Sequence, residues 1–380
     1  MTFPPPKTLV AFSVTNCICH DQRVLKMAGT VSSLNCDITI IGRKRGDCCN
    51  NDTVPFRTKR FRMIFKRGFL FYKFFNIRLF IYLLLHKFDL LVANDLDTLL
   101  PNFLVSKLKG LPLVYDSHEY FTGVPEIQNR PFVKWVWQSI EKMIFPHLKY
   151  VMTVCDSIAA QYDAEYGIRP VTIRNCSGKS DHIQPYPREK LGINKGHLLI
   201  ILQGTGINID RGGEELIEAV RHTENISLLV VGSGDVLANL KDIVNTYNLI
   251  DRIKFISTAP WEAMMRYTKS ADAGVCLDKD TNINYRFSLP NKIFDYISAG
   301  IPMIASNLPE TGKILREYEC GIVIQEVTPI KISNALLELK NNPLKRAELK
   351  RNAVAAAEKL NWEIESEKVK ELYNKILICG

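Results

Sequence analysis

The chain has 380 residues, 46% of them hydrophobic and 23% charged, a composition typical of a globular protein with two domains of ordinary size. Its net charge of +9 favours anionic partners such as nucleotides or phospholipid surfaces. The ten cysteines lack the spacing of a disulfide framework, so we expect them to be reduced and the protein to be cytoplasmic. No signal peptide is recognisable, and Lys73 and Arg78 interrupt the longest apolar run, which argues against a transmembrane segment.

Strand-like and helix-like runs alternate along the first half of the chain, a pattern typical of parallel sheets covered by helices. Strands are expected at 8–14, 38–42, 90–93, 113–116, 151–154 and 171–174, with helices between them such as 21–34 and 132–145. Residues 175–191 are rich in Pro, Gly and Ser and lack periodicity, so we interpret them as a linker.

The second half repeats this alternation. Strands are expected at 198–203, 227–231, 252–256, 273–277, 303–306 and 321–323, with helices such as 212–221 and 344–359. The sequence thus predicts an α/β fold of two Rossmann-like domains, 1–178 and 179–360, with ligands in a cleft at the carboxyl ends of their strands. A final helix, 361–380, is expected to cross back to the first domain.

Residues 287–310 form the most informative segment of the second half. They predict a helix that begins at Pro290, whose missing N–H would have no helical partner, and that ends at Gly300. Ser288 is expected to cap this helix. The free N–H groups of the first helical turn would then offer a binding site for an anion such as a diphosphate.

Two polar residues of the same helix extend this interpretation. Asn291 and Asp295 lie one turn apart on the face opposite the apolar stripe. A carboxylate therefore stands about one helical turn from the expected phosphate site, which is roughly the distance from a diphosphate to a ribose. The segment thus predicts a site for a nucleotide diphosphate.

Several motifs, taken in their order along the chain, resemble those of one enzyme family. They are DQRV at 21–24, NDLDTLLP at 94–101, YDSHE at 115–119, QG with Asn208 and RG at 203–212, LIEA at 216–219, VGSG at 231–234, the segment 289–302, LPE at 308–310 and NWE at 361–363. With this set the sequence resembles the retaining glycosyltransferases of the GT-B fold, family four, in a subgroup with the Leu-Pro-Asn-Lys form. The resemblance covers nearly the whole chain.

The resemblance implies transfer of a sugar from a nucleotide-diphosphate sugar, UDP-sugar foremost, to a hydroxyl acceptor, without metal or other cofactor. Arg211 would contact phosphate oxygens, Asp295 would accept hydrogen bonds from ribose hydroxyls, and His118 would contact the transferred sugar or the acceptor. The family's leaving phosphate is thought to take the acceptor proton. Further substrate-binding residues implied are Asn16, Asp95, Glu119, Gly204, Asn208, Gly232, Ser288, Leu289, Pro290, Asn291 and Lys292.

The chain departs from the family pattern at two positions. Many members have two glutamates separated by seven residues, and here the second falls on Asp295 but the first on Phe287. Many also have an Arg where this chain has Thr205, so that Arg211 is the matched cation and Lys292 our candidate for the second. For single residues plainer interpretations stay open: Arg211 as a solvated arginine, Asp295 as a surface acid and His118 as a structural histidine.

Two clusters could suggest a metal. Asp95 and Asp97 resemble the metal-binding pair of another glycosyltransferase class, but we favour a strand-end turn and helix cap without metal. Cys17, Cys19 and His20 could be ligands, although no second cluster has zinc spacing.

Residues 57–88 combine many cations and aromatic rings with no acid. The cations are Arg57, Lys59, Arg60, Arg62, Lys66, Arg67, Lys73, Arg78 and Lys87. In a helix-prone stretch this composition favours an anionic membrane surface, although part of the segment must be core. We expect a lipid-linked or glycan acceptor and a peripheral position on the cytoplasmic face of the inner membrane; nothing indicates a groove-reading motif for nucleic acid.

Three alternatives remain. A nucleotide-sugar epimerase of the same fold would consume donor without an acceptor. A nicotinamide-dependent oxidoreductase would need a glycine-rich fingerprint, which the first turn at 15–20 lacks. A non-catalytic nucleotide-binding protein would bind donor and never turn over.

Overall fold

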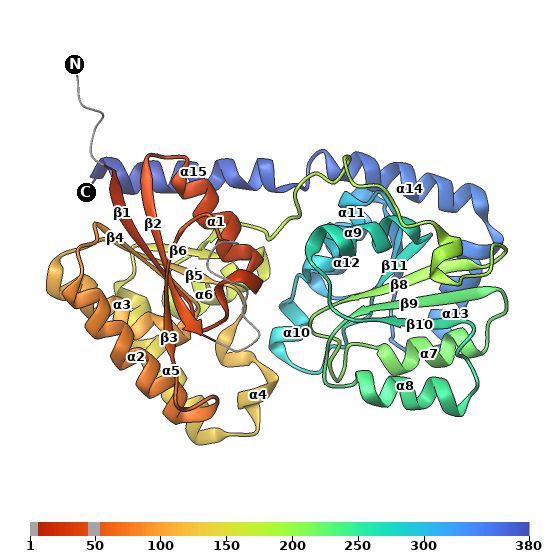
Figure 1. Cartoon of the computed structure of the whole chain (residues 1–380), viewed down its shortest axis with the longest axis horizontal. Helices are drawn as coiled ribbons and strands as arrows, with labels where there is room; N and C mark the ends of the chain where they lie inside the picture. The colour runs from red at the N-terminus through yellow and green to blue at the C-terminus, as the bar shows by residue number, and fades with distance from the viewer. Residues whose placement is uncertain (1–6, 45–53, 380) are drawn as a thin grey trace, which may run out of the picture. The chain divides into compact units, whose positions relative to one another are not determined.

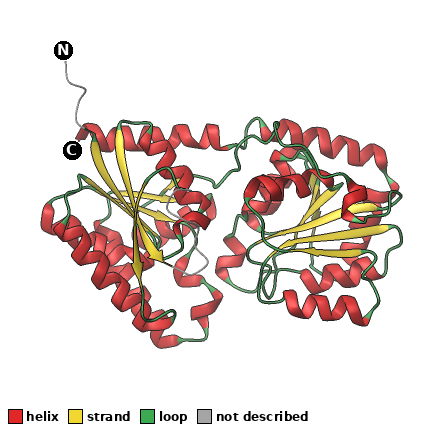
Figure 2. Cartoon of the chain, in the orientation of Figure 1, coloured by secondary structure: helices red, strands yellow, loops and turns green. Residues whose placement is uncertain are grey.

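The computed structural model describes residues 7–44 and 54–379. The chain divides into two compact units, Met1–Arg174 with Glu365–Gly380, and Asn175–Ile364. Each unit contains a parallel sheet with helices on its faces, so the predicted α/β class with two parallel sheets is confirmed (Figures 1 and 2).

The sheet of the first unit has the order β3-β2-β1-β4-β5-β6-β7, and every pairing is parallel. Its strands are β1 (Thr8–Ser13), β2 (Cys36–Lys44), β3 (Arg57–Arg62), β4 (Leu90–Asn94), β5 (Leu113–Ser117), β6 (Tyr150–Thr153) and β7 (Val171–Thr172). Since helices cover both faces, the central strands β4 and β5 are buried at every residue rather than at alternate ones.

The strand β3 corrects our expectation that the whole segment 57–88 is helix-prone. Within it the exposure alternates, with Arg57 and Lys59 exposed and Thr58 and Arg60 less so, which is the period of a strand. Among the described strands it pairs only with β2, so it is an edge strand, and its charged side chains discourage pairing with another chain.

The helices of the first unit are α1 (Gln22–Ser32), α2 (Gly68–Leu85), α3 (Leu96–Lys109), α4 (Pro125–Gln128), α5 (Pro131–Ile144) and α6 (Asp156–Tyr166). Helices α2 and α5 both pack against α3. From Glu365 onward the last helix, α15 (Trp362–Cys379), also belongs to this unit, and its Tyr373 is fully buried.

By length and composition alone, α2 could cross a membrane, although 22% of its residues are buried within the protein. Our sequence analysis discounted this segment because of Lys73 and Arg78. Core helices of proteins that never enter a membrane can have the same length and composition.

The sheet of the second unit has the order β10-β9-β8-β11-β12-β13. Its strands are β8 (Leu198–Gly204), β9 (Ile226–Gly232), β10 (Ile253–Ile256), β11 (Ala273–Cys276), β12 (Met303–Ser306) and β13 (Gly321–Ile324). Its helices are α7 (Gly213–Arg221), α8 (Leu237–Thr246), α9 (Trp261–Ser270), α10 (Ile283–Phe287), α11 (Asn291–Ser298), α12 (Pro309–Tyr318), α13 (Pro329–Asn341) and α14 (Pro343–Ala357).

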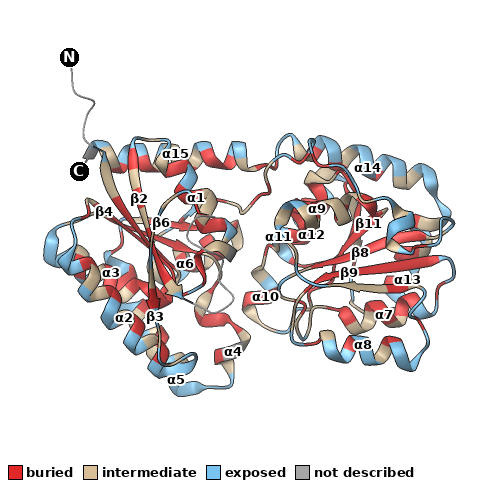
Figure 3. Cartoon of the chain, viewed as in Figure 1, coloured by how far each residue is buried: buried red, intermediate tan, exposed pale blue. Residues whose placement is uncertain are grey.

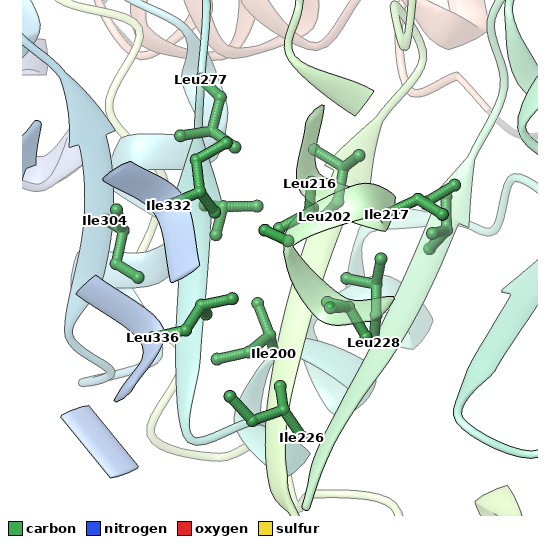
Figure 4. Close-up of a cluster of buried hydrophobic side chains, with 14 of the residues drawn as sticks. Ile200, Leu202, Leu216, Ile217, Ile226, Leu228, Leu277, Ile304, Ile332 and Leu336 are labelled. Atoms are coloured by element: carbon green, nitrogen blue, oxygen red, sulfur yellow. The ribbon is translucent and has the colours of Figure 1, made fainter. Parts of the chain in front are cut away.

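The core of the second unit lies between its sheet and the helices α7 and α13 (Figure 4). Ile200 and Leu202 from β8 meet Leu216 from α7 and Leu336 from α13, all with at most 2% of their surface exposed. Truncating one such leucine to alanine typically lowers the free energy of unfolding by roughly 2–5 kcal/mol. This layer therefore fixes the strands that carry the site.

The segment 175–187 is irregular, as predicted, and a short 3-10 helix (Arg188–Leu191) follows it, but the segment is not a solvated linker. Cys176, Ser177 and Ser180 are buried, and the Ser180 hydroxyl donates to the Ser298 carbonyl at 2.7 Å. The boundary between the units falls after Arg174, whereas we expected it after residue 178.

Five cysteines of the described residues are buried and outside any disulfide: Cys36, Cys155, Cys176, Cys276 and Cys320. Burial raises the pKa of Cys276 to about 12 and that of Cys320 to about 11.

Candidate functional sites at the strand ends of the two units

In the second unit the strand order reverses at β8, which lies between β9 and β11. In open α/β sheets ligands bind at such a reversal, outside the carboxyl ends of the strands. Here those ends are Gly204, Gly232 and Cys276. The topology therefore points to the same place as the predicted phosphate site.

The turns after β8 and β9 interlock through their backbones. A Cβ atom on Gly232, whose φ is +143°, would lie 1.8 Å from the Gly204 carbonyl oxygen. The Ser233 amide donates to that oxygen at 3.0 Å, and the Asn208 side chain accepts from the Asp235 amide at 3.2 Å. Gly204, Asn208 and Gly232, all predicted to bind substrate, thus build one rigid turn pair.

Arg211 lies within this region, but its charge is paired with a carboxylate of the protein. Its guanidinium donates to Asp278 Oδ2 at 2.7 Å and lies 4.5 Å from the centre of the Tyr285 ring. The Asp278 side chain is 1% exposed and that of Arg211 21%. The Arg211 side chain is therefore fixed by an ion pair and a ring contact, and our alternative of a freely solvated arginine is wrong.

The helix α11 begins one residue later than predicted. Pro290 occupies the capping position and makes no side-chain cap, while the Ser288 hydroxyl donates to the Tyr285 carbonyl at 3.0 Å. Ser288 ends α10 instead of capping α11, so that expectation is wrong. Leu289 is buried and Asn291 exposed.

Lys292, in the first turn of α11, is the cation most available for a ligand. Only 8% of it is exposed, and among the residues that the structure describes it has no ion pair or hydrogen bond. Its Cε lies 4.0 Å from the position of a Cβ on Gly204, and its charge lowers the pKa of Cys276 at the end of β11, although burial outweighs that effect. An ammonium that no protein carboxylate neutralises is available to bind an anionic ligand.

We expected Asp295 on an open face of α11. The structure instead buries it inside the unit, with 5% of its surface exposed. Its carboxylate accepts from the Ser177 hydroxyl at 2.5 Å, from Trp261 Nε1 at 3.0 Å and from Gln203 Nε2 at 3.0 Å. It fastens α11 to the end of β8, to α9 and to the segment after residue 174. Contact with a ribose stays a prediction.

In the first unit the strand order reverses between β1 and β4. Asn16 follows β1 and is exposed, and Asp95 follows β4 with φ +62°, an uncommon conformation for a residue other than glycine. Asp95 accepts from the backbone amide of His118, which follows β5, at 2.8 Å. The structure thus brings Asp95 and His118 together as neighbours, with Glu119 next in the chain.

The His118 ring lies between two carboxylates. Nδ1 is 3.2 Å from Asp95 Oδ2, and Nε2 is 3.4 Å from Asp116 Oδ2. Burial alone would lower the pKa of His118, but the two carboxylates outweigh it and raise the pKa to about 9. The ring is therefore an imidazolium at neutral pH, a hydrogen-bond donor rather than a base.

Sequence analysis missed two residues that support this ring. Asp116 is fully buried and paired with Arg23, whose Nε donates at 3.0 Å and whose second nitrogen donates at 2.6 Å. Burial opposes the charge of Asp116, yet the Arg23 guanidinium lowers its pKa below the usual range. The motif DQRV contained the signal, but a partner 93 residues away could not be inferred from it.

The residues of the two candidate metal clusters have the following contacts. Asp97 accepts from the Thr15 hydroxyl at 2.5 Å, and burial together with Asp95 raises its pKa to about 8. The Cys17 and Cys19 sulfurs lie 3.4 Å apart, and the side chain of His20 is outside the described residues. Within the described part of the chain, no three His, Cys, Asp or Glu side chains are placed to hold a metal.

Comparison with known proteins agrees with this geometry. Residues 22–176 match the family model described as Glycosyltransferase Family 4, and residues 187–356 match Glycosyl transferases group 1. Together the two matches take in most of both units. The chain is a glycosyltransferase of the GT-B fold.

This glycosyltransferase is similar along its length to solved structures at low identity. They include sucrose-phosphate synthase from Thermosynechococcus elongatus, 17% identical with a TM-score of 0.77 and coverage of 98% of this chain and 100% of that one. Anabaena HepE in complex with UDP-glucose is 14% identical, with a TM-score of 0.77 and coverage of 97% and 99%.

A curated relative is the chitobiosyldiphosphodolichol beta-mannosyltransferase of Candida albicans, 24% identical over 216 residues. The matched stretch is 51% of this chain and about half of that relative, 46% of its length.

Proposed function

We propose that this glycosyltransferase moves a sugar, with retention of configuration and without a metal, from a nucleotide-diphosphate sugar to a hydroxyl acceptor in surface polysaccharide or glycolipid biosynthesis. One observation carries the donor assignment. Lys292, a buried cation without a partner among the described residues, lies in the first turn of α11 beside Gly204, where the sheet order reverses. A diphosphate supplies the anion that this position lacks.

The donor would be held by three features of the second unit. The first-turn amides of α11 and Lys292 would face the diphosphate, Arg211 would add a second cation, and the space beside Gly204 would let the nucleotide approach the backbone. These charges stabilise the diphosphate as it leaves, which is the main electrostatic demand of the reaction. Lys292 would thereby replace the arginine that family members have where this chain has Thr205.

The first unit would bind the acceptor or the transferred sugar near His118. Because its pKa is about 9, His118 would be charged at neutral pH and would not remove a proton from an acceptor hydroxyl. In the proposed reaction the bond from the anomeric carbon to the phosphate oxygen breaks, the acceptor oxygen bonds to that carbon, and the acceptor proton passes to the leaving phosphate.

UDP-sugar is the first donor to test, since HepE was solved with UDP-glucose. The name of the Candida relative describes mannose transfer to a diphosphodolichol-linked acceptor, which makes a lipid-linked glycan the first acceptor to test.

The first experiment is a thermal-shift comparison of UDP, GDP, ADP and NAD, each with and without magnesium. A ligand that binds the native state raises the melting temperature. We expect one nucleoside diphosphate to do so without magnesium, and the shift to be lost in Arg211→Ala and Asp295→Ala. Since Asp295 is buried, Asp295→Asn separates loss of binding from loss of fold. A shift by NAD alone, or one strictly dependent on magnesium, contradicts the proposal.

The second experiment identifies the reaction. With the donor so found, proton NMR of the product should show the donor's anomeric configuration, and turnover should require an acceptor. Donor epimerised without an acceptor would establish the epimerase alternative, and binding without any turnover would establish a non-catalytic protein.

A further inference from the structure

The helix α2 has two apolar faces. Phe71, Phe75, Leu79 and Leu83, spaced four residues apart, are buried in the first unit. On another side Leu70, Phe74, Ile77 and Ile81 follow helical spacing and are 43–48% exposed. A helix that is apolar on its outer side as well is not a typical water-facing helix.

The helix α5 also exposes aromatic side chains. Phe132 and Trp135 are 69% and 62% exposed, and their rings stack at 6.0 Å. The two helices touch, because the Trp137 ring of α5 meets the Tyr72 ring of α2 at 5.3 Å. Both carry exposed surface in Figure 3. We call Leu70, Phe74, Ile77, Ile81, Phe132 and Trp135 the α2–α5 face.

Positive charge surrounds the α2–α5 face. The segment from Arg57 through residue 88 contains no acid, and most of its cations are exposed. Lys66, Arg67 and Lys73, next to the start of α2 or within it, have no carboxylate partner among the residues that the structure describes. The surface is therefore both apolar and cationic.

We propose that the α2–α5 face docks the first unit onto an anionic bilayer, with α2 lying in the plane of the interface. Apolar and aromatic side chains would enter the headgroup boundary while lysines and arginines bind the lipid phosphates. A second copy of the chain fits the face poorly, because a two-fold contact would bring like charges together. A spanning α2 would remove Phe71 and Leu79 from the core and place Arg78 in hydrocarbon.

The docking face connects to the proposed acceptor site. Trp137 also meets Phe121 at 5.2 Å, and Phe121 lies three residues after His118 in the chain. The helix α5 thus packs, through Trp137, against the segment that follows His118, near which a lipid-linked acceptor would be bound. This connection rests on the proposed function, whereas the docking itself does not.

Flotation of the full chain with lipid vesicles, without nucleotide, tests the docking. We expect binding to vesicles of phosphatidylcholine with about one third phosphatidylglycerol and little binding to phosphatidylcholine alone. The triple variant Lys66→Gln, Arg67→Gln, Lys73→Gln should bind about 100-fold more weakly. The matched control is Lys331→Gln, Lys350→Gln, Arg351→Gln, which removes three exposed cations of the second unit and should bind as the parent does.

The apolar part of the face is tested separately. Phe74→Ser with Trp135→Ser should also weaken binding at least tenfold, roughly, since both side chains leave water on docking. The control Ile330→Ser with Leu344→Ser changes apolar residues that are 72% and 82% exposed in the second unit and should have no effect. Because all four positions are exposed, these variants should keep the melting temperature of the parent.

Three results would overturn the proposal. One is equal binding by the test and control variants, or equal binding to neutral and anionic vesicles. Another is a dimer in sedimentation velocity that Phe74→Ser dissociates, with no vesicle binding, since a second copy would then cover the face. The third is resistance to alkaline carbonate extraction from vesicles, which would mean that α2 spans the bilayer. Nucleotide thermal shifts are measured separately, so failure of docking leaves the donor proposal untouched.

Discussion

At the scale of single residues, His118 couples the stability of the first unit to pH. Its pKa is about 9 in the fold, above an unfolded value of 6.5, so the stability it contributes is full below pH 6.5 and is lost as the pH rises through 9. We therefore expect the contribution of His118 to the free energy of unfolding to fall by up to about 3 kcal/mol between pH 6.5 and 9.5. Denaturant titrations at several pH values would measure this loss.

The matched variant is His118→Gln, which removes the titrating ring but keeps a hydrogen-bond donor. It should be less stable than the parent at pH 6 and should show a smaller loss above pH 6.5. Some slope should remain below pH 8, because the raised pKa of Asp97 disfavours folding as the pH rises toward 8. An unchanged slope in the variant would show that His118 is not held as an imidazolium.

Lys292 gives a second prediction at this scale. Replacement by glutamine should weaken binding of the stabilising nucleoside diphosphate by about tenfold to hundredfold, because a charge-assisted contact is lost. The melting temperature without ligand should not fall, since no protein group among those described depends on this ammonium. Isothermal titration calorimetry measures the first effect, and Lys241→Gln on α8 is the control for net charge. Unchanged affinity would remove Lys292 from the donor site.

At the scale of elements, the turn pair after β8 and β9 depends on glycine. Gly232→Ala would place a Cβ 1.8 Å from the Gly204 oxygen at a positive φ, which we expect to cost roughly 2–5 kcal/mol. Gly29→Ala, inside α1 with open space around it, should stabilise the protein by up to about 1 kcal/mol. Chemical denaturation of both variants compares the two sites, and equal effects would contradict the interlocked geometry.

The positions of most strands and helices could be predicted from the sequence. Strand and helix positions followed from alternating apolar runs, and Gly300 did end α11. The edge strand β3 was missed because its alternation involves charged residues among aromatic ones, and only Phe61 is buried. The burial of Asp295 was missed because helical periodicity describes one helix and not the α9 and β8 residues that close over its other face.

Within the sites, positions could be predicted but pairings could not. Motifs placed His118, Arg211 and Lys292 at strand or helix ends, where parallel topology gathers them. The partner of Arg211, Asp278, lies 67 residues away, and local patterns carry no information about such a contact.

At the scale of the whole molecule, the end of the chain contributes to the stability of its beginning. Tyr373→Ala on α15 should destabilise the first unit by about 3–5 kcal/mol, because the side chain is fully buried there. Tyr373→Phe should be neutral or stabilising, since the hydroxyl is buried without a partner among the described groups.

Scanning calorimetry of Tyr373→Ala should then separate two transitions. The nucleoside diphosphate should raise the temperature of the upper transition only, which belongs to the second unit. At one hundred times its Kd it should add about 3 kcal/mol to the free energy of unfolding of that unit. A nucleotide effect on the lower transition alone would place the donor site in the first unit and contradict the proposal.

The buried thiols described above can report how often each unit opens. Cys36 and Cys155 lie in the first unit, and Cys176, Cys276 and Cys320 in the second. A thiol reacts as the thiolate, so groups that are enclosed and, at Cys276 and Cys320, weakly acidic are alkylated only when the surrounding structure opens. Peptide-resolved alkylation rates would therefore report the opening of each unit separately, in one unmodified protein and during turnover.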